Sequence, residues 1–263
     1  MPRREHTDRE YETELKKVRE GLLLMGARVE EMIQKSIQAL EARDSDLARR
    51  MVEYDRQINR LEVELDETCL RILARRQPVA SDLRFLATAL KLVTDLERIG
   101  DLGVNICERV MELNEEPPLE SYLQVVSMAE AAQEMLREAL DAFVAGDAER
   151  AQNIVERDSK VDDYYATIFR ELLTYMMENP RNIFRATRVQ SIAKYLERIA
   201  DHATNVAEMV VFMVRGKDIR HVGKLERRAQ SGRPPNVTPK PAPSDSDASL
   251  RDVVSQKTPS RRG

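Results

Sequence analysis

The amino-acid sequence predicts an all-α protein built from two tandem, internally duplicated three-helix bundles, each running up, down and up, with a disordered C-terminal tail. Three observations lead to this prediction. The 263 residues include only 9 glycines and 11 prolines, which is few for folds that depend on many turns or phosphate loops. Polar breaks are rare in the first four fifths of the chain, and the segments they separate carry helical apolar spacing. One motif also recurs after one hundred residues, which indicates an internal duplication.

Five short polar breaks divide the body of the chain into six segments. The breaks fall at residues 41–46, 76–78, 114–118, 145–147 and 179–182. Segments of roughly 25 to 35 residues would form helices about 40 to 50 Å long, because an α-helix rises 1.5 Å per residue. Helices of this length joined by short loops are typical of bundles.

Residues at the breaks are suited to helix ends. Asp46 and Asp147 stand at the start of apolar runs, where an aspartate can cap a helix N-terminus. The prolines at 78, 118 and 180 suit the first turn of a helix, which needs no amide donor there.

The third and sixth segments carry matching apolar seams with alternating spacings of four and three. The third has Leu92, Leu96, Ile99, Gly103, Ile106, Val110 and Leu113, and the sixth has Ile192, Leu196, Ile199, Ala203, Val206, Val210 and Met213. This spacing favours one buried helix face. The second and fifth segments also share a phrase, Val52–Asp55 and Val155–Asp158. We therefore predict one bundle over residues 10–116 and a second over 117–215.

The C-terminal residues 216–263 differ in composition from the rest. They hold 11 Lys and Arg against 5 Asp and Glu, a net charge of +6, so the remainder of a chain with net charge −4 carries −10. Six prolines also fall in this stretch, among few apolar residues. Such a segment buries too little surface to offset its ordering entropy, and we predict a mostly disordered basic tail.

The sequence favours a cytoplasmic location. It has no run of 18 apolar residues, and its N-terminus lacks the apolar core of a signal peptide. Cys69 and Cys107 lie far apart in apolar helical patterns, so we expect two buried free thiols.

The pattern Glu-x-x-x-Asp-x-x-x-Asn occurs once in each half. Its members are Glu97, Asp101 and Asn105 in the first half, and Glu197, Asp201 and Asn205 in the second. Residues four apart share a helix face, and carboxylate and amide oxygens are ligands for hard cations. A solvated polar face is the alternative, and it fits Asp101, which lies opposite the seam. Glu97 instead interrupts an apolar stripe, where a carboxylate needs a partner or an ion.

The preceding helices offer further oxygen ligands. Asp55, Asn59 and Glu62 lie in the second segment, and Asp158 and Asp162 lie in the fifth. Gly100 and Gly103, matched by Ala200 and Ala203, would let a neighbouring helix or a ligand come close. We therefore predict metal sites at both duplicated motifs, with the oxygen ligands of the preceding helices as less specific extensions.

Other chemistries have weak support in the sequence. Only three histidines occur, and no Ser-His-Asp or Cys-His arrangement can be assembled, so we expect no catalytic centre. We interpret His202 as a solvated or hydrogen-bonded residue. The acidic body and the lack of a phosphate-cradling loop indicate no specific nucleic-acid partner and no direct binding of free phosphate.

Five separated phrases closely resemble the PhoU family of bacterial phosphate-signalling regulators. They are ARRQPVASDLR at 74–84, DLERIGD at 95–101, LDAF at 140–143, TYMME at 174–178 and GKDIRHVG at 216–223. The resemblance extends over roughly residues 10 to 223 and leaves the Pro-rich tail outside the family pattern.

The resemblance implies a cytoplasmic, dimeric regulator that is not an enzyme. Such a protein represses the phosphate-starvation regulon and restrains phosphate uptake by linking the phosphate ABC transporter ATPase to a sensor histidine kinase, and it can associate peripherally with the membrane. The resemblance also implies multinuclear iron or zinc clusters at Glu97, Asp101, Glu197 and Asp201, with Asn105, Asn205, Asp55, Asp158 and Asp162 as weaker extensions. Two alternatives remain open: a carboxylate-bridged metalloenzyme and a metal-free helical scaffold.

Overall fold

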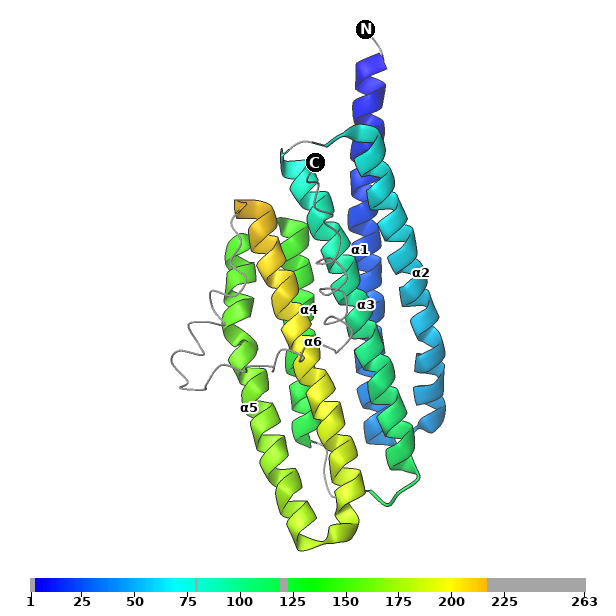
Figure 1. The fold of residues 1–263 in the computed structure, drawn as a ribbon, viewed down its shortest axis with the longest axis vertical. Helices are drawn as coiled ribbons and strands as arrows, with labels where there is room; N and C mark the ends of the chain where they lie inside the picture. Colours follow the sequence, from blue (N-terminus) through cyan, green and yellow to red (C-terminus); the bar gives the residue numbers. More distant parts are fainter. Residues whose placement is uncertain (1–2, 79, 119–122, 217–263) are drawn as a thin grey trace, which may run out of the picture. The chain divides into compact units, whose positions relative to one another are not determined.

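The computed structural model describes residues 3–78, 80–118 and 123–216, and these parts contain helices and no strand. The helices are α1 (Arg3–Ala42), α2 (Ser45–Arg76), α3 (Ala80–Asn114), α4 (Leu123–Ala145), α5 (Ala148–Glu178), the short 3₁₀ helix η1 (Pro180–Asn182) and α6 (Ile183–Arg215) (Figure 1). The all-α prediction is confirmed. The predicted disordered tail, from residue 217 onward, lies outside the described residues.

Each half of the chain forms a three-helix bundle, and the two bundles share a core. In the first half α1, α2 and α3 pack on one another, and α4, α5 and α6 do so in the second. Contacts of α3 with α6 and of α1 with α4 join the halves, so α2 and α5 lie on the outside (Figure 1). All six helices belong to one compact unit. The division into domains 10–116 and 117–215 stays a prediction.

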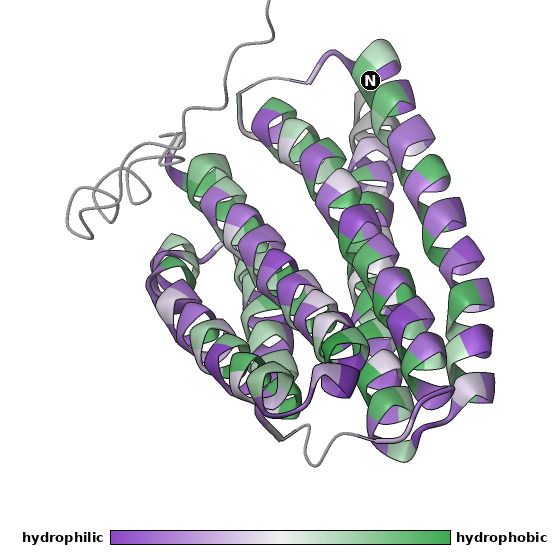
Figure 2. Cartoon of the chain, turned by 60° about the horizontal axis from the view of Figure 1, so that its bottom comes forward, coloured by the Kyte–Doolittle hydropathy of each residue, from purple (hydrophilic) through white to green (hydrophobic). Residues whose placement is uncertain are grey.

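The two predicted seams form the centre of this shared core. Every seam residue of α3 is buried, and so is every seam residue of α6 except Met213, which is half-buried. Figure 2 shows hydrophobic and hydrophilic residues alternating along each helix, as expected for helices that bury one face. The seam spacing therefore identified the buried faces of α3 and α6.

Gly103 allows α1 to approach α3 closely. A Cβ atom at residue 103 would lie 2.4 Å from Cγ of Met32, well inside the contact distance of two carbons. Glycine costs about 1 kcal/mol against alanine in a helix interior, and here that cost is offset by the packing of Met32.

The N-cap of α2 differs from the prediction. Asp44, and not Asp46, adopts the extended cap conformation, and its carboxylate accepts a hydrogen bond of 2.8 Å from the amide of Leu47. Asp46 lies inside the first turn and pairs with Arg49. Asp147 is the N-cap of α5, as predicted, and accepts from the amides of Glu149 and Arg150.

Pro180 stands in the first turn of a helix, as predicted, but that helix is the short η1. Helix α6 follows it without a cap from the side chain of Asn182. Helix α1 begins at Arg3. Arg76 of α2 pairs with Glu10 at 2.8 Å and with Glu14 at 3.0 Å, and these contacts hold the early turns of α1 against α2.

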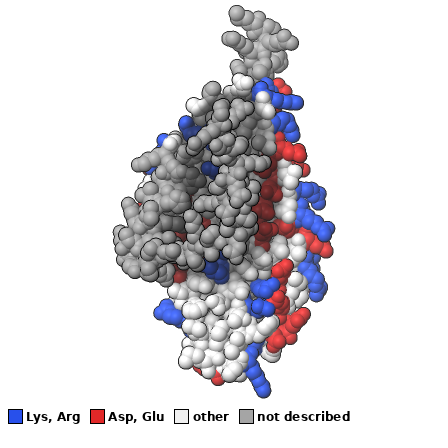
Figure 3. Space-filling view, in the orientation of Figure 1, with Lys and Arg blue, Asp and Glu red and all other residues white. Residues whose placement is uncertain are grey.

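The surface carries charge unevenly. In Figure 3 acidic side chains gather in a strip over α2 and α3, whereas the lower end of α5 and α6 is mostly uncharged. Across the described helices, no stretch is both long and apolar enough to cross a bilayer.

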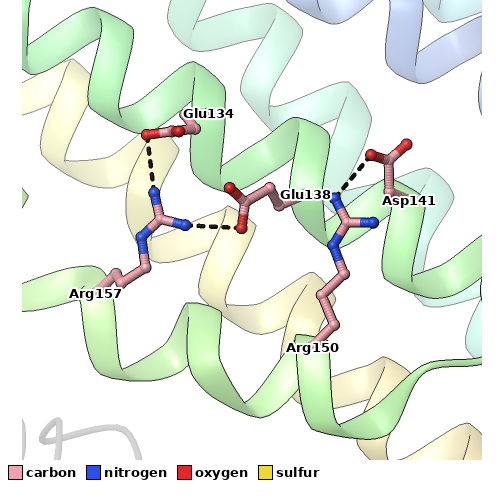
Figure 4. Close-up of polar contacts among 5 residues, drawn as sticks. All are labelled: Glu134, Glu138, Asp141, Arg150 and Arg157. Carbon is pink, nitrogen blue, oxygen red and sulfur yellow. Dashed lines mark hydrogen bonds and ion pairs between the residues drawn. The ribbon is translucent and has the colours of Figure 1, made fainter.

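Ion pairs join α4 to α5 along their outer faces (Figure 4). Arg157 binds Glu134 at 2.8 Å and Glu138 at 2.7 Å, and Arg150 binds Asp141 at 3.0 Å. The residue of the first half that matches Arg157 is Tyr54. Tyr54 donates a hydrogen bond to Glu31 of α1 and accepts one of 2.8 Å from Arg28. This duplicated position therefore joins the first two helices of each half, by hydrogen bonds of a tyrosine in the first half and by ion pairs of an arginine in the second.

We predict that Arg157→Ala lowers the free energy of unfolding by about 1 kcal/mol, because it removes two partly exposed ion pairs at once. Urea unfolding followed by circular dichroism measures this change. Arg150→Ala is the matched control, since it removes a single, more exposed pair and should cost about 0.5 kcal/mol or less. Equal losses in the two variants would contradict a special contribution from Arg157.

Candidate metal centre

The first candidate site lies where α2 packs against α3. Glu97 and Asp101 stand one turn apart on α3, and Gly100 lies between them. The lack of a side chain at Gly100 admits Asp55 of α2, whose Oδ1 atom is 3.2 Å from the place that a Cβ at residue 100 would take. Asp55 is only 9 % exposed. The two glycines beside the motif therefore allow close packing of neighbouring helices: Gly100 packs against α2, and Gly103 packs against α1.

Several oxygen atoms in this groove are buried without a hydrogen-bond partner among the described residues. They are Oδ1 of Asp55, Oδ1 of Asn59 and Oδ1 of Asp66. Asn59 donates from Nδ2 to Oδ2 of Asp55 at 2.7 Å, which leaves its own carbonyl oxygen unused. A buried acceptor without a partner is costly, and a bound cation or water would satisfy it.

The carboxylates of this groove repel one another. Burial raises the pKa of Glu97, and the negative charges of Asp101, Glu62 and Asp55 raise it further. Burial is also the main cause of the raised pKa of Asp55, to which Asp101 adds. We call Asp55, Asn59, Glu62, Asp66, Glu97 and Asp101 the first carboxylate set.

Glu62 and Asp66 connect this set along α2. Burial raises the pKa of Glu62, and the charges of Asp66 and then Asp101 raise it further. Burial alone raises the pKa of Asp66. Asp66 was not among the residues predicted from the sequence. Its spacing of four from Glu62 is the signal that would have found it.

The second candidate site lies between α5 and α6. We call Asp158 and Asp162 of α5 with Glu197 and Asp201 of α6 the second carboxylate set. Thr204 donates a hydrogen bond of 3.4 Å to Oδ1 of Asp158. Lys194, one turn before Glu197 on α6, forms an ion pair with it.

Neither carboxylate set forms a complete coordination sphere for a metal ion. Among the described residues, no three carboxylate, thiolate or imidazole groups converge closely enough to hold a metal ion as they stand. Asn105 and Asn205 are half-buried one turn beyond Asp101 and Asp201. Side-chain rotation within the groove would be required for the carboxylates to meet at one ion, so the predicted metal ligands stay a prediction.

His202 has a structural partner in the other half of the chain. It is 9 % exposed, and its Nδ1 donates a hydrogen bond of 2.6 Å to Oδ1 of Asp95 on α3. This contact joins α6 to α3 across the interface between the bundles. The sequence showed that His202 lies beside Asp201 but could not show that Asp95 faces it from 107 residues away.

The two cysteines lie in α2 and α3, and Cys69 is one turn beyond Asp66 of the first carboxylate set. Both are free and buried, as predicted. Burial raises the pKa of Cys69 to about 11 and that of Cys107 to about 12, so both thiols stay protonated and unreactive at neutral pH. The charge of Asp66 adds to the raised pKa of the Cys69 thiol.

A hollow of about 530 Å³ between α1 and α4 lies outside the predicted sites. Its lining mixes Lys35 and Arg137 with Glu30, Glu31 and Glu130. Burial raises the pKa of Glu30, while the nearby Arg137 lowers it. This balance of charges resembles an ordinary polar groove between helices and indicates no particular ligand.

An apolar surface lies at the end of the bundle where α5 connects to α6. It consists of Phe169, Leu173, Met177, Ile183 and Phe184, all exposed, with Met177 at 85 %. The first three follow one face of α5 at spacings of four, and the other two begin α6. The white area at the bottom of Figure 3 covers this end of the two helices. Contiguous exposed apolar residues mark surfaces that bind other proteins.

The chain matches the family model described as "PhoU domain" twice, over residues 22–110 and 125–210. It is 46% identical over 219 residues to the phosphate-specific transport system accessory protein PhoU homolog of Pseudomonas aeruginosa, covering 83% of this chain and 90% of that protein. It is 38% identical over 218 residues to phosphate-specific transport system accessory protein PhoU of Escherichia coli, covering 83% and 90%.

Solved structures agree with the fold. The crystal structure of PhoU from Pseudomonas aeruginosa has a TM-score of 0.76 and 46% identity, covering 79% of this chain and 100% of that one. The regulatory protein PhoU from the phosphate transport system of Streptococcus pneumoniae has a TM-score of 0.74 and 30% identity, covering 80% and 99%.

We predict that Glu97→Gln stabilises the metal-free protein by about 0.5 to 1 kcal/mol, because it removes a carboxylate that is half-buried among like charges. Urea unfolding in excess chelator measures the difference. Glu67→Gln on the exposed face of α2 serves as the control for a simple change of net charge. A loss of stability in Glu97→Gln, or the same gain in Glu67→Gln, would contradict the repulsion that we describe.

Proposed function

Because this chain belongs to the PhoU family, we propose that it is a cytoplasmic accessory protein of phosphate transport that restrains phosphate uptake and represses the phosphate-starvation response. The observation that carries the proposal is the match itself, which spans both halves and about nine tenths of each relative. Those relatives are named as accessory proteins of a phosphate-specific transport system. The neighbour from Streptococcus pneumoniae is named as a regulatory protein.

The regulator would act by binding other proteins. We propose the ATPase of the phosphate ABC transporter and the sensor histidine kinase of the phosphate regulon as its partners, and a homodimer as its assembly. The exposed apolar surface on α5 and α6 supports docking onto a protein, because it would otherwise be left in water.

We further propose that the carboxylate sets bind metal cations. The donors of the first set fit a hard cation, because they are carboxylate and amide oxygens and three of them are buried without a partner. Thiolate is absent from both sets, and the one histidine beside them already binds Asp95. The donors therefore suit iron, manganese, magnesium or calcium better than a zinc site rich in sulfur and nitrogen. A bound cation would supply positive charge that cancels the repulsion among the carboxylates.

Affinity capture from the native host tests the regulatory function. The tagged full chain is purified from cells grown in high and in low phosphate, and bound proteins are identified by mass spectrometry. We expect a phosphate-transporter ATPase or a sensor kinase whose recovery changes with phosphate. Recovery of neither in both conditions would overturn the adaptor proposal.

We predict that Leu173→Glu reduces this capture at least tenfold, because it places a charge between Phe169 and Met177 on the exposed apolar face of α5. Leu24→Glu on α1 is the matched control, since Leu24 is similarly exposed, at 47 % against 41 %. Circular dichroism checks that both variants keep their helices. Equal capture by the two variants would show that the partner binds elsewhere.

We predict that the double variant Asp101→Asn, Asp201→Asn retains less metal after purification, while its helicity is unchanged. Inductively coupled plasma mass spectrometry measures the bound metal. Glu12→Gln combined with Glu20→Gln, at exposed positions of α1, is the control with the same change of net charge. An unchanged metal content in the double variant would remove these two aspartates from the proposed sites.

A further inference from the structure

We propose that the two carboxylate sets are not equivalent: the first set is the tight site for a divalent cation, and Lys194 makes the second set the weak one. This inference rests on the proposed binding of metal by the duplicated motifs. It concerns which set binds first and which residue sets the difference.

The difference begins on the outer helices. When Val52–Asp55 is matched to Val155–Asp158, Asp55 corresponds to Asp158 and Asn59 to Asp162. In the same register Tyr165 takes the place of Glu62, and Phe169 takes the place of Asp66. The second half has therefore replaced two carboxylates by aromatic rings at the positions where the first set continues along α2.

The inner helices differ at one position that bears directly on the motif. Thr94 of α3 corresponds to Lys194 of α6. The hydroxyl of Thr94 donates to the carbonyl of Leu90 at 3.2 Å, within its own helix. The ammonium of Lys194 instead pairs with Glu197, and it lies 5.4 Å from the centroid of the Tyr165 ring, within range of a cation–π contact.

These contacts give the motif glutamates different surroundings. Glu97 lies near the carboxylates of Asp101, Glu62 and Asp55. Its positive neighbour is Arg98 of the same helix, and Glu97 forms no ion pair with any described residue. Glu197 already has a positive charge beside it, supplied by the chain. A cation entering the second set must displace Lys194 from Glu197 and approach its ammonium, so the attraction to that set is reduced.

The buried oxygens point the same way. Asp55 is only 9 % exposed, and its Oδ1 atom has no hydrogen-bond partner among the described residues. This atom lies against Gly100, a residue between Glu97 and Asp101 in the motif. The carbonyl of Asn59 is likewise unpartnered and buried beside it. A cation gains most where it satisfies oxygens that have no other partner, and the first set supplies them.

Lys194 thus acts as a built-in competitor for the second set. Replacing Lys194 by the threonine of the first half should tighten binding at the second set by on the order of tenfold, a change of about 1.4 kcal/mol. The reciprocal change, Thr94→Lys, should weaken binding at the first set by a similar factor. Lys194→Met separates charge from length, because methionine keeps the long side chain and loses the ammonium.

The test is a titration of the metal-stripped full chain with MnCl₂ by isothermal titration calorimetry, with free Mn²⁺ counted by electron paramagnetic resonance. Glu97→Gln and Glu197→Gln assign the binding phases to the two sets. Lys17→Thr is the control for net charge, since Lys17 is an exposed residue of α1, which packs against α2, α3 and α4.

We expect a tight phase that Glu97→Gln removes and a weak phase that Glu197→Gln removes, with Lys194→Thr and Lys194→Met strengthening only the weak one. Loss of the tight phase in Glu197→Gln, or a weak phase that Lys194→Thr leaves unchanged, would overturn the inference while metal binding stands. Absence of any Mn²⁺ binding in every variant would overturn metal binding by the motifs, and this inference with it.

Discussion

The packing of α3 on α6 is the contact on which the rest of the molecule depends. These two helices carry matching buried seams, and the contact of one helix with the other joins two bundles into one unit. Since one face of each helix is committed to this core, the outer helices must pack on the remaining faces. The hydrogen bond between His202 and Asp95 crosses the same interface, where it fixes the two helices in one register.

That constraint explains where the carboxylates lie. Helix α3 contacts α6 and receives Met32 of α1 at Gly103, while Gly100 and the neighbouring Glu97 border the groove with α2, where Asp55 enters. The duplicated motif on α6 faces α5 in the same way. The duplication therefore places two similar grooves on one frame, and the differences between the two carboxylate sets lie at exposed or half-buried positions outside the core. Another matched position differs in the same way: Tyr54 joins α2 to α1 by a hydrogen bond, whereas Arg157 joins α5 to α4 by an ion pair.

Sequence patterns predicted the features that depend on spacing along one helix. The seams of α3 and α6, the buried thiols and the cap at Asp147 belong to this class, because helical periodicity determines which residues share a face. Asp44 was missed as a cap because Asp46 is as good a candidate by composition, and only the backbone conformation separates them. The partners His202 and Asp95, and Lys194 beside Tyr165, depend on which faces meet in space, and one helix at a time does not specify that.

The outer position of α2 and α5 has a consequence for motion. Within the described helices α2 packs only against α1 and α3, and α5 only against α4, α6 and η1, whereas α3 and α6 also hold the two halves together. Helices at the edge of a bundle open more readily than those at its centre, so amide hydrogens on α2 and α5 should exchange sooner. A ligand that bridged α2 to α3 would slow that opening along the whole of α2. A protein that recognises α2 could then respond to how often the helix is detached, with no change in the average structure.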